Sequence, residues 1–145
     1  MGTSGLAEAY HERTGMADMD YQAVANLHHQ VCRLLNVSDE MAGTHRLNRQ
    51  QFVLMLAIKG LSSEERPTIT TLAKKLCLRH HSVVELLNRL AARGAAVRGT
   101  SGREKREVIV SLTPLGDEII QESTELYLKQ LKAVCPDLGL SLMRV

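Results

Sequence analysis

The sequence predicts a mainly α-helical domain with one small β-hairpin. Apolar residues recur at helical spacing along most of the chain, whereas residues 107–112 are rich in β-branched side chains. Aromatic residues make up only 3% of the 145 residues, and Phe52 is the sole Phe. A core of Leu, Val, Ile and Ala suits helices that pack on helices, so an all-β fold is disfavoured.

The first long helix is expected over residues 19–44, after a loose tail at residues 1–17. Its apolar positions form a stripe at helical spacing: Val24, Leu27, Val31, Leu34, Leu35 and Met41. This stripe is too long to be covered by one short neighbouring helix. We therefore expect this helix to pack across a subunit boundary.

Two shorter helices should follow. Asn48 and Gln51 form a looser version of a capping box at the start of one helix, which ends in the segment 62–67. Thr68 is suited to cap the next helix, which is two to three turns long. The buried side of this short helix is expected to consist of Leu72, Ala73 and Leu76.

The next helix is predicted from about residue 80 to 93, with Gly94 placed to end it. Its apolar positions fall on one face: Val83, Leu86, Leu87 and Leu90. Two strands, 95–100 and 107–112, are then expected around a turn at Ser101 and Gly102. Residues 46–113 therefore predict a helix-turn-helix followed by a two-stranded wing.

The last long helix should start at Thr113 and Pro114, with Thr as N-cap and Pro at the first helical position, and end before Pro136. It has more apolar surface than a small helix-turn-helix can cover. Residues 19–44 and 114–145 are therefore expected to form a dimerisation module. The whole chain, 1–145, is interpreted as a single domain of this kind.

The charge distribution is more informative than the net charge of +2, which comes from 18 basic and 16 acidic residues. Between Arg89 and Arg106 there is one acid, Glu104, against six basic residues: Arg89, Arg93, Arg98, Arg103, Lys105 and Arg106. A local basic patch of this kind is typical of a nucleic-acid interface.

Several other classes of protein are disfavoured. Three cysteines, Cys32, Cys77 and Cys135, show no metal-ligand spacing and no even disulfide set, so a reducing cytoplasm is expected. No stretch approaches the roughly 20 apolar residues of a membrane span, so a membrane partner is not expected. No nucleophile–base pair or phosphate loop is evident, so we predict no enzyme and no cofactor.

The histidines do not predict a metal site. His28–His29 and His80–His81 are adjacent pairs, whose side chains diverge by about 100° on a helix. His28 and Cys32 share a helix face but have too few companion ligands.

The order and spacing of several motifs resemble those of the MarR (multiple antibiotic resistance regulator) family of winged-helix transcription factors. The matching segments are LNRQQFVLML at 47–56, Leu72–Ala73 with Leu76, Ser82–Val83 with Asn88–Arg89–Leu90, Arg93–Gly94, and EKREVIVSLTPLG at 104–116. The resemblance extends over roughly residues 20–135.

The resemblance implies a dimer in which the second helix of the helix-turn-helix enters the major groove and the wing reaches the minor groove. The family's acidic–basic–Arg wing triplet falls on Glu104, Lys105 and Arg106, where Glu104 replaces the usual Asp and is expected to position the wing. Arg103 is a further candidate for the minor-groove contact. Arg79 stands where Ser or Thr often caps the helix.

The side chains of the helix at about 80–93 are suited to contact a DNA groove. His80, His81 and Ser82 lie at the helix N-terminus, where free N–H groups attract phosphate or base acceptors. Glu85 and Asn88 are candidate base contacts, with simple solvation as the alternative. The full expected DNA-binding set is Arg79, His80, His81, Ser82, Val84, Glu85, Asn88, Arg89, Arg103, Lys105 and Arg106. Arg89 and Arg93 are equally suited to pairing with acids near the wing and to contacting phosphate.

The expected function is a sequence-specific DNA-binding transcriptional regulator: a homodimeric repressor on a pseudo-palindromic operator, released by a small-molecule or oxidative signal. Nothing in the sequence identifies an effector or its binding residues. Cys77, in the helix-turn-helix turn, is a candidate oxidation sensor, with a packed structural residue as the alternative. The alternative function is a non-enzymatic protein-interaction module built on a winged-helix scaffold.

Overall fold

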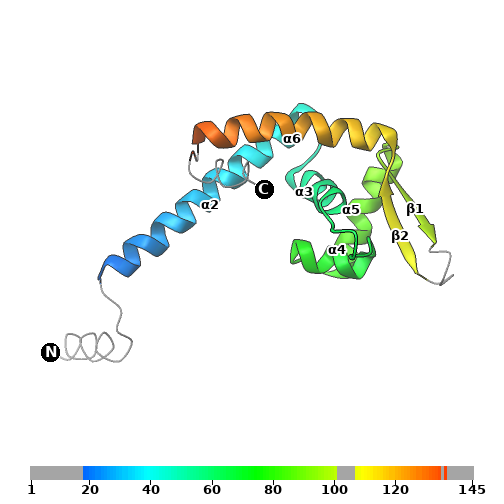
Figure 1. The fold of residues 1–145 in the computed structure, drawn as a ribbon, viewed down its shortest axis with the longest axis horizontal. Helices are drawn as coiled ribbons and strands as arrows, with labels where there is room; N and C mark the ends of the chain where they lie inside the picture. Colours follow the sequence, from blue (N-terminus) through cyan, green and yellow to red (C-terminus); the bar gives the residue numbers. More distant parts are fainter. Residues whose placement is uncertain (1–17, 101–106, 135, 137–145) are drawn as a thin grey trace, which may run out of the picture. The chain divides into compact units, whose positions relative to one another are not determined.

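The computed structural model describes residues 18–100, 107–134 and 136. The elements in chain order are α2 (Asp18–Thr44), α3 (Arg49–Lys59), α4 (Ile69–Leu76), α5 (His80–Ala92), β1 (Ala96–Thr100), β2 (Val108–Leu112) and α6 (Pro114–Val134). Figure 1 shows that α6 starts at the hairpin and runs over α3. The structure confirms the predicted mainly helical fold with a small β-hairpin.

The chain divides into two compact units, and the boundary falls inside α2 between Leu34 and Leu35. Near the C-terminal end of α2, Val37, Met41 and Ala42 are buried. Farther towards the N-terminus, the helix exposes apolar side chains at helical spacing. These are Tyr21, Val24, Leu27 and Val31, followed by Leu35.

Helix α3 begins with the predicted capping box. The side chain of Asn48 accepts a hydrogen bond from the backbone N–H of Gln51 at 2.8 Å, and the side chain of Gln51 accepts one from the N–H of Asn48 at 2.9 Å. Two N–H groups that have no partner within the helix are thereby satisfied. Beyond the cap, α3 buries Phe52, Leu54 and Met55 completely.

Thr68 caps helix α4, as predicted. Its Oγ1 accepts a hydrogen bond from the N–H of Thr71 at 3.2 Å. The same residue forms an isolated antiparallel bridge with Ile109. One residue earlier, the carbonyl of Pro67 accepts from the N–H of Val110 at 2.9 Å. The segment before α4 therefore pairs with β2 and fixes the hairpin to the helices.

The hairpin is antiparallel, with Ala96 opposite Leu112, Arg98 opposite Val110 and Thr100 opposite Val108. Directly opposite residues point to the same face of a sheet. The three pairs therefore share one face of the hairpin, and because Ala96 and Val110 are buried, this shared face is the inner one.

Thr113 joins the end of α5 to the start of α6. Its N–H donates to the carbonyl of Ala95 at 3.0 Å, and its hydroxyl donates to the carbonyl of Gly94. The same hydroxyl accepts from the N–H of Gly116 at 3.1 Å, which confirms Thr113 as the N-cap. Gly94 has a φ of +75°, so it can end α5 without the strain that a side chain would add.

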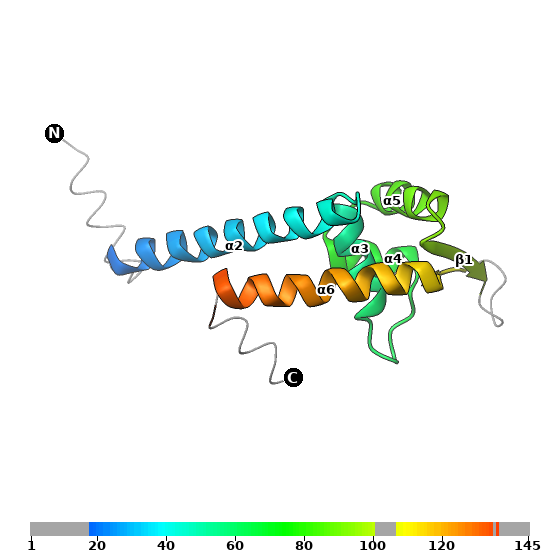
Figure 2. The ribbon, with the colours of Figure 1, turned by 90° about the horizontal axis from the view of Figure 1, so that it is seen from above.

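One core cluster links α3, α4, α5, the hairpin and α6. Its fully buried large side chains include Phe52, Leu54, Met55, Leu72, Val83, Leu87, Leu90 and Val110. The ring centroids of Phe52 and Tyr127 lie 5.8 Å apart with an interplanar angle of 55°, a tilted arrangement that aromatic pairs favour. In the view from above, α5 lies to one side of α6 (Figure 2).

Candidate nucleic-acid interface

The turn between α4 and α5 sets the direction of α5. Cys77 adopts a left-handed conformation, with a φ of 53°, and caps α4. Its N–H donates to the carbonyl of Lys74 at 3.3 Å, and the N–H of Leu78 donates to that of Ala73 at 3.0 Å. These bonds end α4 and turn the chain sharply into α5, as in a helix-turn-helix.

Helix α5 has one buried face and one accessible face. The four predicted apolar positions, Val83, Leu86, Leu87 and Leu90, are all buried, with exposures of 5% or less. The predicted outer residues Arg79, His80, His81, Glu85, Asn88 and Arg89 are exposed, and Ser82 and Val84 are half-buried. The structure therefore places the α5 residues of the expected DNA-binding set on the outside of the helix.

The N-terminus of α5 has no side-chain cap, because the Arg79 side chain makes no capping hydrogen bond. The carbonyl of Arg79 instead accepts from the N–H of Ser82 at 3.1 Å and from that of Val83 at 3.2 Å. No capping side chain thus competes for the other N–H groups of the first turn, those of His80 and His81, which can meet an acceptor such as a phosphate.

Two arginines contact the outer face of α5. Nη2 of Arg89 lies 3.1 Å from the carboxylate of Glu85, one turn earlier. Nη2 of Arg98, on β1, donates to Oδ1 of Asn88 and lies 3.4 Å from the carbonyl oxygen of Val84. The candidate base contacts Glu85 and Asn88 are therefore each held by an arginine.

Arg93 has a role that the sequence did not predict. Its guanidinium donates to the carbonyl oxygens of His45 at 2.7 Å and Arg46 at 3.1 Å, in the loop between α2 and α3. These carbonyls were not among the sequence-based alternatives for Arg93, an acid near the wing or a phosphate, and a phosphate contact stays a prediction. Arg93 therefore fastens the end of α5 to the α2–α3 loop.

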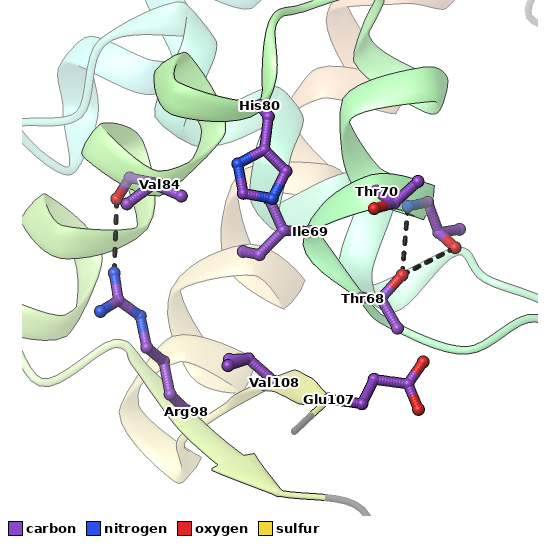
Figure 3. Close-up of a pocket in the computed structure, with 9 residues that line it drawn as sticks. Thr68, Ile69, Thr70, His80, Val84, Arg98, Glu107 and Val108 are labelled. Atoms are coloured by element: carbon purple, nitrogen blue, oxygen red, sulfur yellow. Dashed lines mark hydrogen bonds between the residues drawn. The ribbon is translucent and has the colours of Figure 1, made fainter. Parts of the chain in front are cut away.

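A cleft of about 660 Å³ lies between the starts of α4 and α5 and the hairpin. It is lined by Thr68, Ile69, Thr70, Thr71, His80, Val84, Arg98, Glu107 and Val108. Figure 3 shows Arg98 extending from the hairpin to Val84, with His80 and Thr68 on the other walls.

Glu107 forms an ion pair at the edge of this cleft. One of its carboxylate oxygens lies 2.6 Å from Nη2 of Arg66. That same buried oxygen has no hydrogen-bond partner among the described residues, so the attraction is that of opposite charges and lacks a well-directed hydrogen bond. The pair adds a third link between the segment before α4 and the wing, at the residue that precedes β2.

Solved structures with the same architecture identify the fold. AbsC, a MarR family transcriptional regulator from Streptomyces coelicolor, matches with a TM-score of 0.72 and 14% identity over 85% of this chain and 82% of AbsC. The chain has the fold of the MarR family. No protein-family model and no curated protein match the sequence.

Two further structures with the MarR fold are informative. A mutant of MarR from E. coli, complexed with operator DNA, matches with a TM-score of 0.66 and 19% identity over 83% of this chain and 86% of that chain. BpsR from Bordetella bronchiseptica, whose DNA binding is regulated by 6-hydroxynicotinic acid, matches with a TM-score of 0.62 and 19% identity over 78% and 83% of the two chains.

Within this MarR fold, α4 and α5 form the helix-turn-helix, and β1 and β2 form the wing. The predicted wing residues Arg103, Glu104, Lys105 and Arg106 lie outside the described residues. Their expected minor-groove contact therefore remains a prediction.

Sequence reasoning missed Arg98 as a site residue and counted it only as part of the basic patch. The available signal was the strand register: Arg98 alternates with exposed Val97 and lies two residues after small, buried Ala96. This pattern places Arg98 on the inner face of the wing, towards α5.

The two described cysteines lie on the protein surface. Cys32 and Cys77 are free and exposed, so a packed structural role for Cys77 is wrong. Across the described part of the chain, no group of three or more His, Cys, Asp or Glu side chains could hold a metal ion. Within the same residues, no helix combines the length and hydropathy needed to cross a bilayer.

Proposed function

We propose that this protein is a sequence-specific DNA-binding transcriptional regulator that acts as a homodimer in the cytoplasm. The main support is the outer face of α5, which presents polar and basic side chains and an N-terminus without a side-chain cap, while its other face is buried. A helix of this kind fits the major groove of DNA. The fold shared with MarR in its operator complex supports the same role.

The homodimer is supported by the apolar side chains along α2. Tyr21, Val24, Leu27 and Val31 are 43–62% exposed, and one more apolar residue, Leu35, follows one turn later. A long stripe of this kind on a surface helix marks an interaction site. Residues 114–145 are the proposed second part of the dimer interface. Light scattering coupled to size exclusion should give twice the chain mass; a monomer at micromolar concentration would contradict the proposal.

DNA binding is tested by selecting bound duplexes from a random pool and measuring affinity against salt concentration. We expect a pseudo-palindromic motif and a linear fall of log affinity with log salt, because bound phosphates release counterions. The double variant Arg103→Ala, Arg106→Ala should weaken binding across sequences and flatten the salt dependence. An absence of sequence preference, together with a flat salt response, would instead favour the protein-interaction module.

The proposed regulator is a repressor released by a signal, and a small molecule is the first candidate. The cleft beside Arg98 and His80 is open to a small molecule and adjoins α5 directly. Because 6-hydroxynicotinic acid regulates BpsR, this acid is a reasonable first probe. Addition of the probe to the DNA complex should raise the dissociation constant if the cleft couples to α5, and unchanged affinity would remove this compound from consideration.

Oxidation is the second candidate signal. The thiol of Cys77 is exposed at the turn that sets the direction of α5, so modification there would act on the DNA-binding helix. Peroxide should weaken DNA binding of the wild type and leave Cys77→Ser unaffected. Equal loss in both proteins would exclude Cys77 as the sensor, and Cys32→Ser serves as the matched control.

A further inference from the structure

The position of Arg98 in the wing directs its side chain towards α5. Arg98 pairs with Val110, which is completely buried, so both side chains point to the inner face of the hairpin. An arginine on the outer face would point to solvent or phosphate. Arg98 instead spans the space between β1 and the middle of α5 (Figure 3).

The contact with Asn88 fixes the orientation of the Asn88 amide. A guanidinium has five N–H donors and no acceptor, so only the amide oxygen of Asn88 can face it. Arg98 Nη2 donates to this oxygen and also lies 3.4 Å from the carbonyl of Val84, one turn earlier on the same face. The amide nitrogen is consequently turned away from Arg98.

This orientation changes what Asn88 can offer to a base. An asparagine recognises adenine by accepting from N6–H with its oxygen while donating to N7. In this structure the oxygen already accepts from Arg98 and lies beside a positive charge, which disfavours the approach of a second donor. The unit formed by Asn88 and Arg98 therefore presents N–H donors.

We propose that Arg98 is a specificity-determining residue that makes Asn88 select a base with acceptors on its major-groove edge. Guanine, with N7 and O6, meets this requirement, whereas adenine presents an N6 amino donor. The inference rests on the proposed DNA-binding function and adds to it the class of base selected. Arg98 acts here by positioning Asn88, so the effect is confined to one base pair in each half-site.

The test is a selection of bound duplexes from a random pool by the wild type and three variants. Asn88→Ala first identifies the base pair that depends on Asn88, since the preference there should be lost. Arg98→Met removes the donors at similar length and should lower the guanine-over-adenine ratio at that base pair by about tenfold. Arg98→Lys keeps a cationic donor and should retain most of the guanine preference.

The outcomes separate the possible roles of Arg98. If Arg98→Met leaves the motif unchanged, or weakens all sequences equally, then Arg98 only holds the wing and the inference is wrong. The inference is also wrong if the wild type prefers adenine at the base pair that depends on Asn88. If the wild type enriches no motif, the proposed DNA-binding function itself fails, and the inference fails with it.

Thermal melts of all four proteins accompany the selection. Arg98→Met is expected to melt close to the wild type, because both partners in the contact are exposed. If Arg98→Met does not fold, Arg98→Gln replaces it, because Gln removes the positive charge but keeps an N–H donor. At the base pair that depends on Asn88, Arg98→Gln should then prefer adenine more than the wild type does. An adenine preference no greater than that of the wild type would overturn the role assigned to the positive charge.

Discussion

Replacement of Gly116 by Ala tests the junction between α6 and the wing. A Cβ atom at position 116 would lie 2.0 Å from the carbonyl oxygen of Ala95, 3.0 Å from its carbonyl carbon and 3.3 Å from Cβ of Leu112. The two nearest atoms belong to the backbone, so rotation of a side chain cannot relieve the overlap. The start of α6 must move away from the wing.

The expected cost combines three effects. Overpacking of a well-packed site costs about 1–3 kcal/mol. Movement of α6 also weakens the cap made by Thr113, worth about 1 kcal/mol. Ala is better than Gly in a helix by roughly 1 kcal/mol, which offsets part of this loss. We expect Gly116→Ala to lower the free energy of unfolding by about 2 kcal/mol and the melting temperature by about 8 °C.

Calorimetry or circular dichroism at fixed protein concentration measures the change. Gly43→Ala is the matched control, because Gly43 is also helical and a Cβ there meets nothing within 4 Å. This control should gain a few tenths to about 1 kcal/mol. If Gly116→Ala is as stable as Gly43→Ala, the close packing of α6 on Ala95 is refuted.

Two further predictions concern ionic side chains. Arg93→Met should lower the free energy of unfolding by about 1 kcal/mol, because two loop carbonyls lose a charged donor. Arg89→Met, which removes an exposed ion pair, should lower it by only about 0.5 kcal/mol or less. Equal losses in denaturant melts would contradict the role of Arg93 in fastening α5 to the α2–α3 loop. The hydrogen bond from Lys75 holds the pKa of Glu65 below its ordinary value, so the pair stabilises the fold above that ordinary value and loses its contribution as the pH falls through the lowered pKa. Lys75→Met should therefore have less acid-dependent stability than the wild type between about pH 5 and 3, and an identical pH profile would contradict this explanation.

Local patterns in the sequence predicted the helices and their ends well. The capping box at Asn48, the caps at Thr68 and Thr113 and the stop at Gly94 depend only on neighbouring residues, and the structure confirms all four. The buried face of α5 was predicted completely, because the spacing of its apolar residues determines one face of a helix.

Contacts between residues far apart in sequence could not be predicted in this way. Arg93 reaches loop carbonyls 47 and 48 residues away, and Arg98 reaches the α5 side chain of Asn88 across the hairpin. Both contacts depend on how elements far apart in sequence cross. Strand alternation can place Arg98 on the inner face of the wing, but it cannot identify Asn88 as its partner, and no residue pattern marks the two loop carbonyls that Arg93 contacts. The sequence therefore located the candidate interface but missed how its arginines organise it.

We propose that two copies of α5, one from each protomer, lie in the major groove of DNA. Protection of guanine N7 from dimethyl sulfate on a selected duplex tests it directly, because this atom lies in the major groove. We predict two protected patches on one face of the duplex, centred about 10–10.5 base pairs apart or a multiple of this spacing. Bound protein that leaves every guanine N7 unprotected would contradict the account.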